Sequence, residues 1–221
     1  MFTTGNSFID CLFIAITFLP LIPAALTLFS DFGKETPQLI FILCLVNFIR
    51  DLPIHLHMLT PANQAVTNNI CYPIELLLLF RLFQPVWTIS IRYMLTIFLV
   101  AYLSSLLTWL SAKGWSNNTL EIVKNTVLLG VVLLSLSPLI RSKGLDIFRS
   151  PLHWVAGGTL FYLLILLLLE GINPNCALSQ ASNGAAIPAN AENSLFLSLA
   201  AIVRYLLYTL AVWPRREKLE L

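Results

Sequence analysis

Residues 151–170 read PLHWVAGGTLFYLLILLLLE, and no charged side chain occurs between the histidine and the final glutamate. An α-helix rises about 1.5 Å per residue, so about 20 apolar residues cross the hydrocarbon core of a bilayer, which is about 30 Å thick. The stretch therefore predicts a transmembrane helix.

Six further stretches have a similar length and character: 7–29, 37–57, 69–87, 92–111, 119–140 and 194–213. The connections between them are short and rich in turn formers, except for the long connection 171–193. The first stretch is too long for the apolar core of a signal peptide and has no basic residue before it, so we expect a retained helix. The sequence predicts an all-α membrane protein in which residues 1–221 form a single bundle of seven transmembrane helices.

Composition supports this class. Hydrophobic residues make up 57% of the chain and charged residues 11%, whereas soluble domains carry roughly 25% charged residues. The net charge of +2 leaves no basic excess of the kind that phosphate contacts require. We expect the lipid bilayer as a partner and no nucleic acid.

Basic residues predict the orientation. With seven spans, one side of the membrane holds only Lys113 and Lys124, whereas the other holds Lys34, Arg92, Arg141, Lys143, Arg149, Arg215, Arg216 and Lys218. Because basic loops stay in the cytoplasm, the amino terminus is expected outside and the carboxyl terminus inside.

Ionisable residues within the spans are the most informative for function. A charge near the bilayer centre costs about 2.5–3.5 kcal/mol on insertion scales, so it usually faces a bundle interior or a wet cavity. Arg50, Glu75 and Arg204 lie in the second, third and seventh spans. The second and third spans are antiparallel neighbours and can bring Arg50 next to Glu75. Such a pair either only holds the helices together or lines a ligand pocket, and for Arg204 the alternative to a pocket is snorkelling or pairing with a carbonyl.

Two tyrosines join this set of candidate ligand-binding residues. Tyr72 precedes Glu75 by one helical turn, and Tyr162 brings a hydroxyl into the sixth span after the small residues 156–159, which let another helix approach closely. The outer half of the bundle collects further charged residues and two histidines, whereas its inner half is nearly free of charge apart from Arg81 and Arg204. This distribution indicates a polar vestibule open to the outside. The outer half holds Asp10, Asp51, His55, His57, Glu121, Lys124 and Glu170, and the alternative for helix-end residues such as Asp10 and Glu170 is solvation at the level of the lipid headgroups.

Metal, cofactor and catalytic motifs are not evident. His55 and His57 are weak metal candidates, because an i, i+2 spacing directs two ligands apart on a helix, and His153 is expected at the opposite membrane face. A retinal protein would need a lysine inside the sixth or seventh span, and neither contains one. We predict no cofactor, no metal and no catalytic residue.

Cysteine positions allow one disulfide. Cys71 and Cys176 both fall on the predicted outer side, where an oxidising compartment could join them, and Cys11 is a competing partner. Cys44 is expected as a small buried hydrophobic residue.

Two segments resemble a known group of membrane proteins. Residues 68–77 read NNICYPIELL and open the third span, and residues 151–162 contain Trp154, Gly158 and Tyr162. They are similar to the third and sixth helices of uncharacterised seven-helix membrane proteins of Gram-negative bacteria, which resemble the membrane sensory modules of histidine kinases. The resemblance implies an inner-membrane location with a periplasmic amino terminus, and functional positions at Glu75, Trp154 and Tyr162.

Kinase members of that group continue into a cytoplasmic output domain after the seventh helix, whereas this sequence stops at Leu221. Either a separate cytoplasmic or membrane partner receives the signal, or the chain is a truncated piece, or it has another role.

Three functions therefore stand as hypotheses. The first is a receptor-like or sensory protein that binds a small ligand in an outward-facing polar pocket, with Gly157 and Gly158 as candidate pivots. The second is a transporter or channel for a small polar solute or protons, which would require polar residues in the inner half as well. The third, an intramembrane enzyme acting on a lipid, lacks a spaced set of acid, base and metal ligands.

Overall fold

The computed structural model describes residues 7–29, 34–56, 58, 61–111, 117–143, 150–172 and 191–213, and within these ranges every regular element is helical. In chain order the elements are α1 (Ser7–Phe18), α2 (Leu21–Phe29), α3 (Glu35–His55), α4 (Pro61–Phe83), η1 (Gln84–Val86), α5 (Ile89–Ser111), α6 (Asn117–Lys143), α7 (Pro151–Ile172) and α9 (Ala191–Val212).

Five helical segments are long and apolar enough to cross a membrane: Glu35–Pro53, Val66–Val86, Lys124–Arg141, Pro151–Leu169 and Leu195–Val212. They coincide with five of the seven predicted spans. The chain is therefore an all-α protein with several membrane-length apolar helices.

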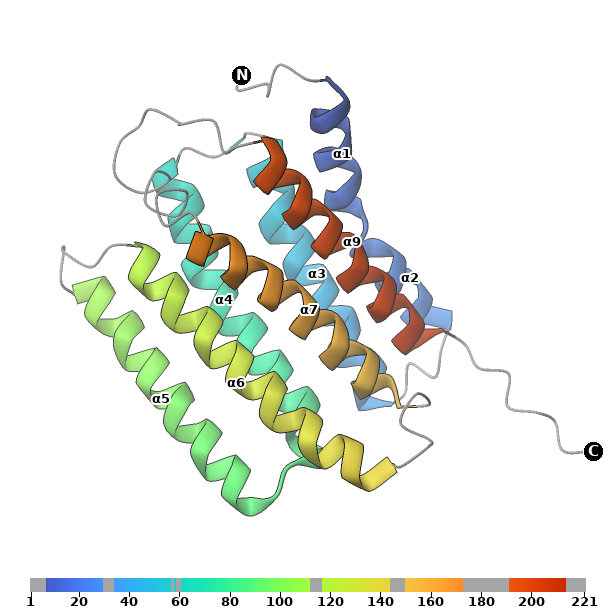
Figure 1. Cartoon of the computed structure of the whole chain (residues 1–221), viewed down its shortest axis with the longest axis vertical. Helices are drawn as coiled ribbons and strands as arrows, with labels where there is room; N and C mark the ends of the chain where they lie inside the picture. Colours follow the sequence, from blue (N-terminus) through green and yellow to red (C-terminus); the bar gives the residue numbers. More distant parts are fainter. Residues whose placement is uncertain are drawn as a thin grey trace, which may run out of the picture.

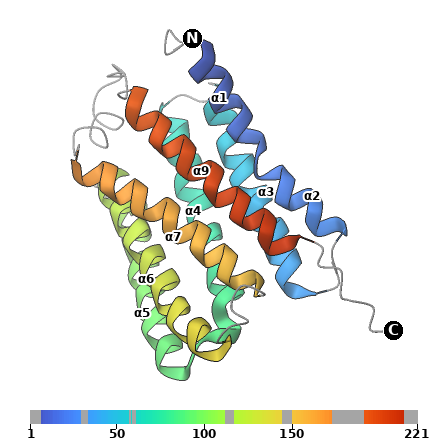
Figure 2. The ribbon, with the colours of Figure 1, turned by 45° about the vertical axis from the view of Figure 1, so that its right-hand side comes forward.

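The first predicted span is two helices rather than one. Proline cannot donate the backbone hydrogen bond of a helix interior, and its ring clashes with the preceding turn. Pro20 accordingly ends α1 in a turn, in which the Leu19 N–H donates to the Ile16 carbonyl at 3.1 Å and the Ile22 N–H donates to the Leu19 carbonyl at 3.1 Å. The α2 helix then continues along the same side of the bundle (Figure 2).

Six helices form a closed ring. Going around it, α2 packs on α3, α3 on α4, α4 on α6, α6 on α7, α7 on α9, and α9 back on α2. The α1 helix packs on α3 and α9, and α5 packs on the outer side of α6 (Figure 1). The centre of the ring is therefore enclosed by side chains from six directions.

The closest approach in the ring is between α7 and α9. A Cβ added at Gly158 would lie 3.0 Å from the Arg204 carbonyl oxygen and 3.2 Å from the Leu207 Cβ. The residues at 156–159 thus allow close helix packing as expected, and the helix that approaches them is α9.

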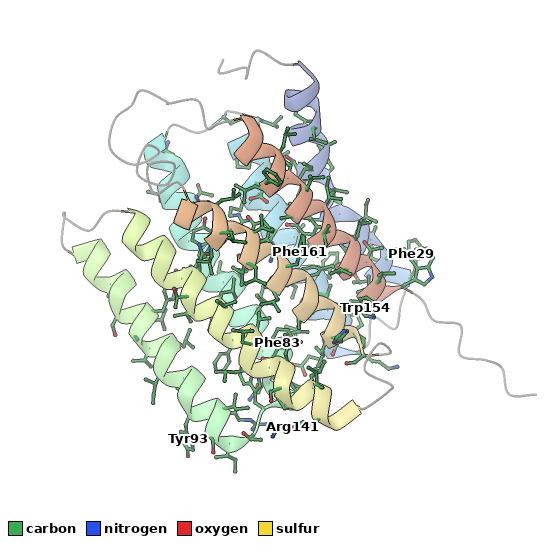
Figure 3. The ribbon with its side chains drawn as sticks, in the orientation of Figure 1. Phe29, Phe83, Tyr93, Arg141, Trp154 and Phe161 are labelled. Atoms are coloured by element: carbon green, nitrogen blue, oxygen red, sulfur yellow. The ribbon has the colours of Figure 1, made fainter. Side chains whose placement is uncertain are left out.

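We call the end of the bundle where α4 passes into α5 the basal end. Figure 3 shows Tyr93 and Arg141 at this end, far from the amino terminus. Among the described residues, the buried side chains of the basal half include no charged group, and most are apolar: Phe83, Trp87, Val132, Leu139, Val155 and Val212. The Trp87 indole N–H donates to the Ser135 hydroxyl at 2.7 Å, and that hydroxyl donates to the Val131 carbonyl at 2.5 Å, so these polar groups are paired.

Arg81 is not inside the bundle, contrary to the sequence-based placement. It is exposed at the basal end of α4, where its Nε donates to Glu35 Oε1 at 2.6 Å and its Nη1 donates to Gln84 Oε1 at 2.7 Å. Arg81 lies in the last turn of α4, which ends at Phe83 and not at residue 87 as predicted, so its side chain leaves the bundle at the helix end.

Candidate functional site

The Glu75 carboxylate lies at the centre of the ring and bonds two guanidinium groups. Arg204 Nη2 on α9 donates to Glu75 Oε1 at 2.5 Å, and Arg50 Nη1 on α3 donates to Glu75 Oε2 at 3.2 Å. Glu75 and Arg204 are both 3% exposed, so they form an ion pair in a medium from which water is excluded. The Arg50–Glu75 contact is the one expected from antiparallel neighbours.

Arg50 has a second carboxylate partner on its own helix. Its Nε donates to Asp51 Oδ1 at 2.6 Å and its Nη2 donates to Asp51 Oδ2 at 3.2 Å. Since this pairing engages both carboxylate oxygens, it fixes the plane of the guanidinium and leaves Nη1 directed at Glu75.

Arg204 is held by hydroxyl groups and aromatic rings. Its Nε donates to the Tyr208 hydroxyl at 3.2 Å. Thr159 donates its hydroxyl proton to the Val155 carbonyl at 2.8 Å, so the 2.7 Å bond between Thr159 and Tyr208 has Tyr208 as donor. The guanidinium carbon lies near three tyrosine ring centroids, 5.1 Å from Tyr162, 5.4 Å from Tyr208 and 5.8 Å from Tyr205. The faces of these rings stabilise the guanidinium cation in a region from which water is excluded.

Lys124 brings a third cation to the same region. Its Nζ lies 3.4 Å from the centroid of the Tyr72 ring, and the Arg50 guanidinium carbon is 5.5 Å from that centroid. Lys124 is 7% exposed, so this residue, which the sequence places in the outward polar vestibule, is buried in the bundle. The α6 helix starts early enough to carry it into the bundle.

We call this set the Glu75 cluster. It comprises Arg50, Asp51, Glu75, Lys124 and Arg204 with the aromatic side chains Tyr72, Tyr162, Tyr205 and Tyr208. Its members come from α3, α4, α6, α7 and α9. A buried charge network of this kind in a membrane protein is costly to insert and typically marks a functional site.

Two side chains stand out among the buried polar groups of the described residues, because no polar atom of either has a hydrogen-bond partner. One is the Asn47 carboxamide, of which neither Nδ2 nor Oδ1 is bonded, and the other is the Tyr102 hydroxyl on α5. Asn47 is fully buried and lies one helical turn before Arg50 on α3. Buried polar groups are nearly always paired, so an exception commonly marks a place for water or a ligand.

All five predicted ligand-binding residues, Arg50, Tyr72, Glu75, Tyr162 and Arg204, meet in this cluster. Snorkelling does not account for Arg204, which is deeply buried and pairs with Glu75. Trp154 lies near the basal end of α7 and packs against the apolar core, away from the cluster (Figure 3).

The sequence did not predict Tyr205 and Tyr208 of the cluster or the nearby Asn47 and Thr159, and it placed Asp51 and Lys124 only in the outer vestibule. One available signal was the i, i+4 spacing of Arg204 and Tyr208, which places a cation and a phenol on the same helix face. The others carry no local signal, because their neighbours come from distant parts of the chain.

The remaining candidates are placed only in part. His55 ends α3, and His57 lies outside the described residues. Cys71 on α4 is half-buried and is bonded to no other described cysteine. Cys176 lies outside the described residues, and the structure does not describe the side chain of Cys11, so the disulfide stays a prediction. Cys44 is fully buried, as expected of a small hydrophobic residue.

Within the described ranges, no three or more His, Cys, Asp or Glu side chains converge in a way that could hold a metal ion. The cluster is thus an ion-pair and tyrosine network, suited to holding charge and accepting hydrogen bonds. Comparisons of the chain with protein-family models, with curated proteins and with solved structures find no match.

Proposed function

We propose that this chain is a receptor-like protein of the bacterial inner membrane that binds a small ligand at the Glu75 cluster. The observation that carries the proposal is the position of the cluster, at the centre of a ring of six helices and next to an apolar, tightly packed basal half. A site that is polar on one side and sealed on the other takes up a ligand without passing it through.

The proposal includes seven membrane crossings with a periplasmic amino terminus and a cytoplasmic carboxyl terminus. The two crossings beyond the five membrane-length segments are α1 with α2, and α5, which is 23 residues long. The exposed Arg81, Arg92 and Arg141 support a cytoplasmic basal end, because basic residues accumulate on that side.

Signal transfer would use the α7–α9 contact. Arg204 belongs to the cluster, and its backbone carbonyl lies against Gly158, so a change at Arg204 acts directly on the closest helix contact in the bundle. We propose that ligand binding shifts α9 on α7 and that a cytoplasmic or membrane partner reads this shift at the basal end, as the resemblance to kinase sensory modules suggests.

A transporter is the second candidate, favoured by one observation: the unpaired Asn47 carboxamide continues the polar set one turn beyond Arg50. Transport needs access from both membrane faces, and the apolar basal half argues against a path to the cytoplasm.

Cysteine accessibility separates the two functions without knowledge of the ligand. In a background free of its four native cysteines, we would introduce Tyr72→Cys in the cluster or Val131→Cys in the basal half. Each variant would be treated with a membrane-impermeant maleimide from either side of the membrane. Thr88→Cys, exposed at the basal end, is the positive control for the cytoplasmic side, and lipid-facing Ile74→Cys is the negative control.

The receptor proposal expects labelling of Tyr72→Cys from the periplasmic side only and no labelling of Val131→Cys. Labelling of both positions from the cytoplasmic side would make transport the better description. If Tyr72→Cys reacts from neither side, the cluster only holds the helices together and the proposal is wrong.

A further inference from the structure

We propose that the ligand of the Glu75 cluster is a small carboxylate, and that it binds Arg50 and Arg204 in place of the Glu75 side chain. This inference rests on the proposed function and names the chemistry of the ligand. In the structure described above, the Glu75 carboxylate occupies the position that the ligand would take.

The two guanidiniums already form a carboxylate site. Arg50 and Arg204 approach different oxygens of one carboxylate, from helices that are not neighbours in the ring. Guanidinium N–H groups match the geometry of a carboxylate, and converging donors of this kind recognise carboxylates wherever they are supplied.

Both cations remain in place when Glu75 leaves. Asp51 holds two N–H groups of Arg50, and Tyr208 with the surrounding tyrosine rings holds Arg204. The site is therefore pre-organised, and a ligand does not have to order it. The Glu75–Arg204 bond, in contrast, reaches across the ring between α4 and α9, which makes it the contact that an incoming carboxylate can exchange.

A cationic ligand fits this site poorly. The only carboxylates of the described cluster are Asp51 and Glu75, and the oxygens of both are already bonded to guanidinium groups. A cation would also come close to Arg50, Lys124 and Arg204 in a medium where charges are weakly screened.

Asn47 supplies an independent observation. Its unpaired carboxamide is fully buried one turn from Arg50 and can donate a hydrogen bond to a ligand that is larger than the Glu75 carboxylate alone. An asparagine with no role would be better replaced by an apolar residue, because an unsatisfied buried amide is costly.

The displacement has a mechanical consequence. When an external carboxylate takes over both guanidiniums, the ion pair that ties α4 to α9 is broken, whereas Arg204 keeps its contacts with α7 through Tyr208 and Thr159. The ligand therefore frees α9 from α4 and leaves the contact with α7 in place, so that α9 can shift on α7, and this shift is the signal.

Chemical rescue tests the inference. The full chain carrying Glu75→Ala is placed in lipid nanodiscs, and its thermal unfolding is followed in sodium formate and in sodium chloride at the same ionic strength. Glu75→Ala leaves two buried guanidiniums short of an anion, so the midpoint falls below that of the wild type. Formate is expected to restore it with a saturable concentration dependence, and chloride is not.

Glu75→Gln is measured in parallel, because it keeps the side-chain volume if Glu75→Ala does not fold. Either variant should bind formate about tenfold or more tightly than the wild type, since no internal carboxylate competes for the two guanidiniums. Adding Asn47→Leu is expected to weaken the binding of propionate, the larger probe, without lowering the unfolding midpoint.

Equal shifts in formate and chloride, or rescue by methylammonium chloride, would overturn the inference. If Tyr72→Cys is reached by maleimide from the periplasm but formate has no specific effect, the ligand class is wrong and the receptor proposal stands. If maleimide cannot reach the cluster from either side, the receptor proposal itself fails.

Discussion

At the scale of single residues, the protein buries opposite charges in contact, so that each offsets part of the free-energy cost of burying the other. A lone charge in a bilayer is costly, but Glu75 and Asp51 together offset the charges of Arg50 and Arg204, and tyrosine faces cover Arg204. The sequence alone predicts the Arg50–Glu75 contact, because consecutive antiparallel helices are neighbours. It does not predict the Glu75–Arg204 contact, because nothing local indicates that α9 faces α4 across the ring.

Substitution of Arg204 should strongly lower the stability of the protein. Arg204→Leu leaves Glu75 with only Arg50 as a guanidinium partner and removes one of the two partners of the Tyr208 hydroxyl, so we expect a loss of about 3–5 kcal/mol in the free energy of unfolding. Unfolding in mixed lipid–detergent micelles measures this loss. The matched control is Arg81→Leu, which breaks the exposed pair with Glu35 and should cost about 1 kcal/mol or less.

The double variant Arg204→Leu/Glu75→Leu checks the cause. If an unpaired charge is what destabilises the single variant, removal of both charges should recover part of the loss. A double variant that is less stable than the sum of the two single variants predicts would contradict the ion-pair explanation.

At the scale of helices, length and apolar composition predict most of the elements. The segments 151–170 and 194–213 agree with α7 and α9 to within a few residues. Hydropathy fails in two places for different reasons. Pro20 ends α1 although the residues on either side of it are equally apolar. Residues 61–68 are polar and yet form the first turns of α4.

The contact between α7 and α9 gives a sharp prediction. A methyl group at Gly158 would lie too close to the Arg204 backbone, so Gly158→Ala must push the helices apart, at a cost of about 1–3 kcal/mol. The control is Gly130→Ala on α6, where an added Cβ has no atom within 4 Å. That substitution should be neutral or stabilise the protein slightly, because alanine favours the helix by up to about 1 kcal/mol.

Thermal unfolding of the two glycine variants in the same nanodiscs compares them directly. Equal midpoints would show that the α7–α9 contact yields easily, and α9 would then be a poor element for transmitting a shift.

At the scale of the whole molecule, the ring of six helices brings the residues of the cluster together. The sequence predicts the order of the five membrane-length segments, but ring closure depends on contacts between elements far apart in the chain, such as α2 with α9. Periodicity and composition are properties of one segment and carry no information on which segments meet. This is why the candidate residues could be chosen from the sequence, whereas their common site could not be constructed.

The orientation can be measured with reporter fusions. Green fluorescent protein joined after Leu221 should fluoresce and alkaline phosphatase at the same point should be inactive, because we expect the carboxyl terminus in the cytoplasm. Phosphatase joined after Ser111, at the other end of α5, should be active. Phosphatase activity at Leu221 would reverse the orientation and place the Glu75 cluster within reach of cytoplasmic ligands.

The ion pair that spans the ring also has a consequence for biogenesis. The α3 and α4 helices leave the ribosome well before α9, so Glu75 and Arg50 can pair early, whereas Arg204 must enter the membrane as the final cation. Its insertion is favourable only once the earlier helices have gathered around an anion that can receive it. Insertion of α9 therefore depends on correct assembly of the earlier helices. A bundle assembled incorrectly leaves this helix with an unpaired charge, which a quality-control protease could recognise in the membrane.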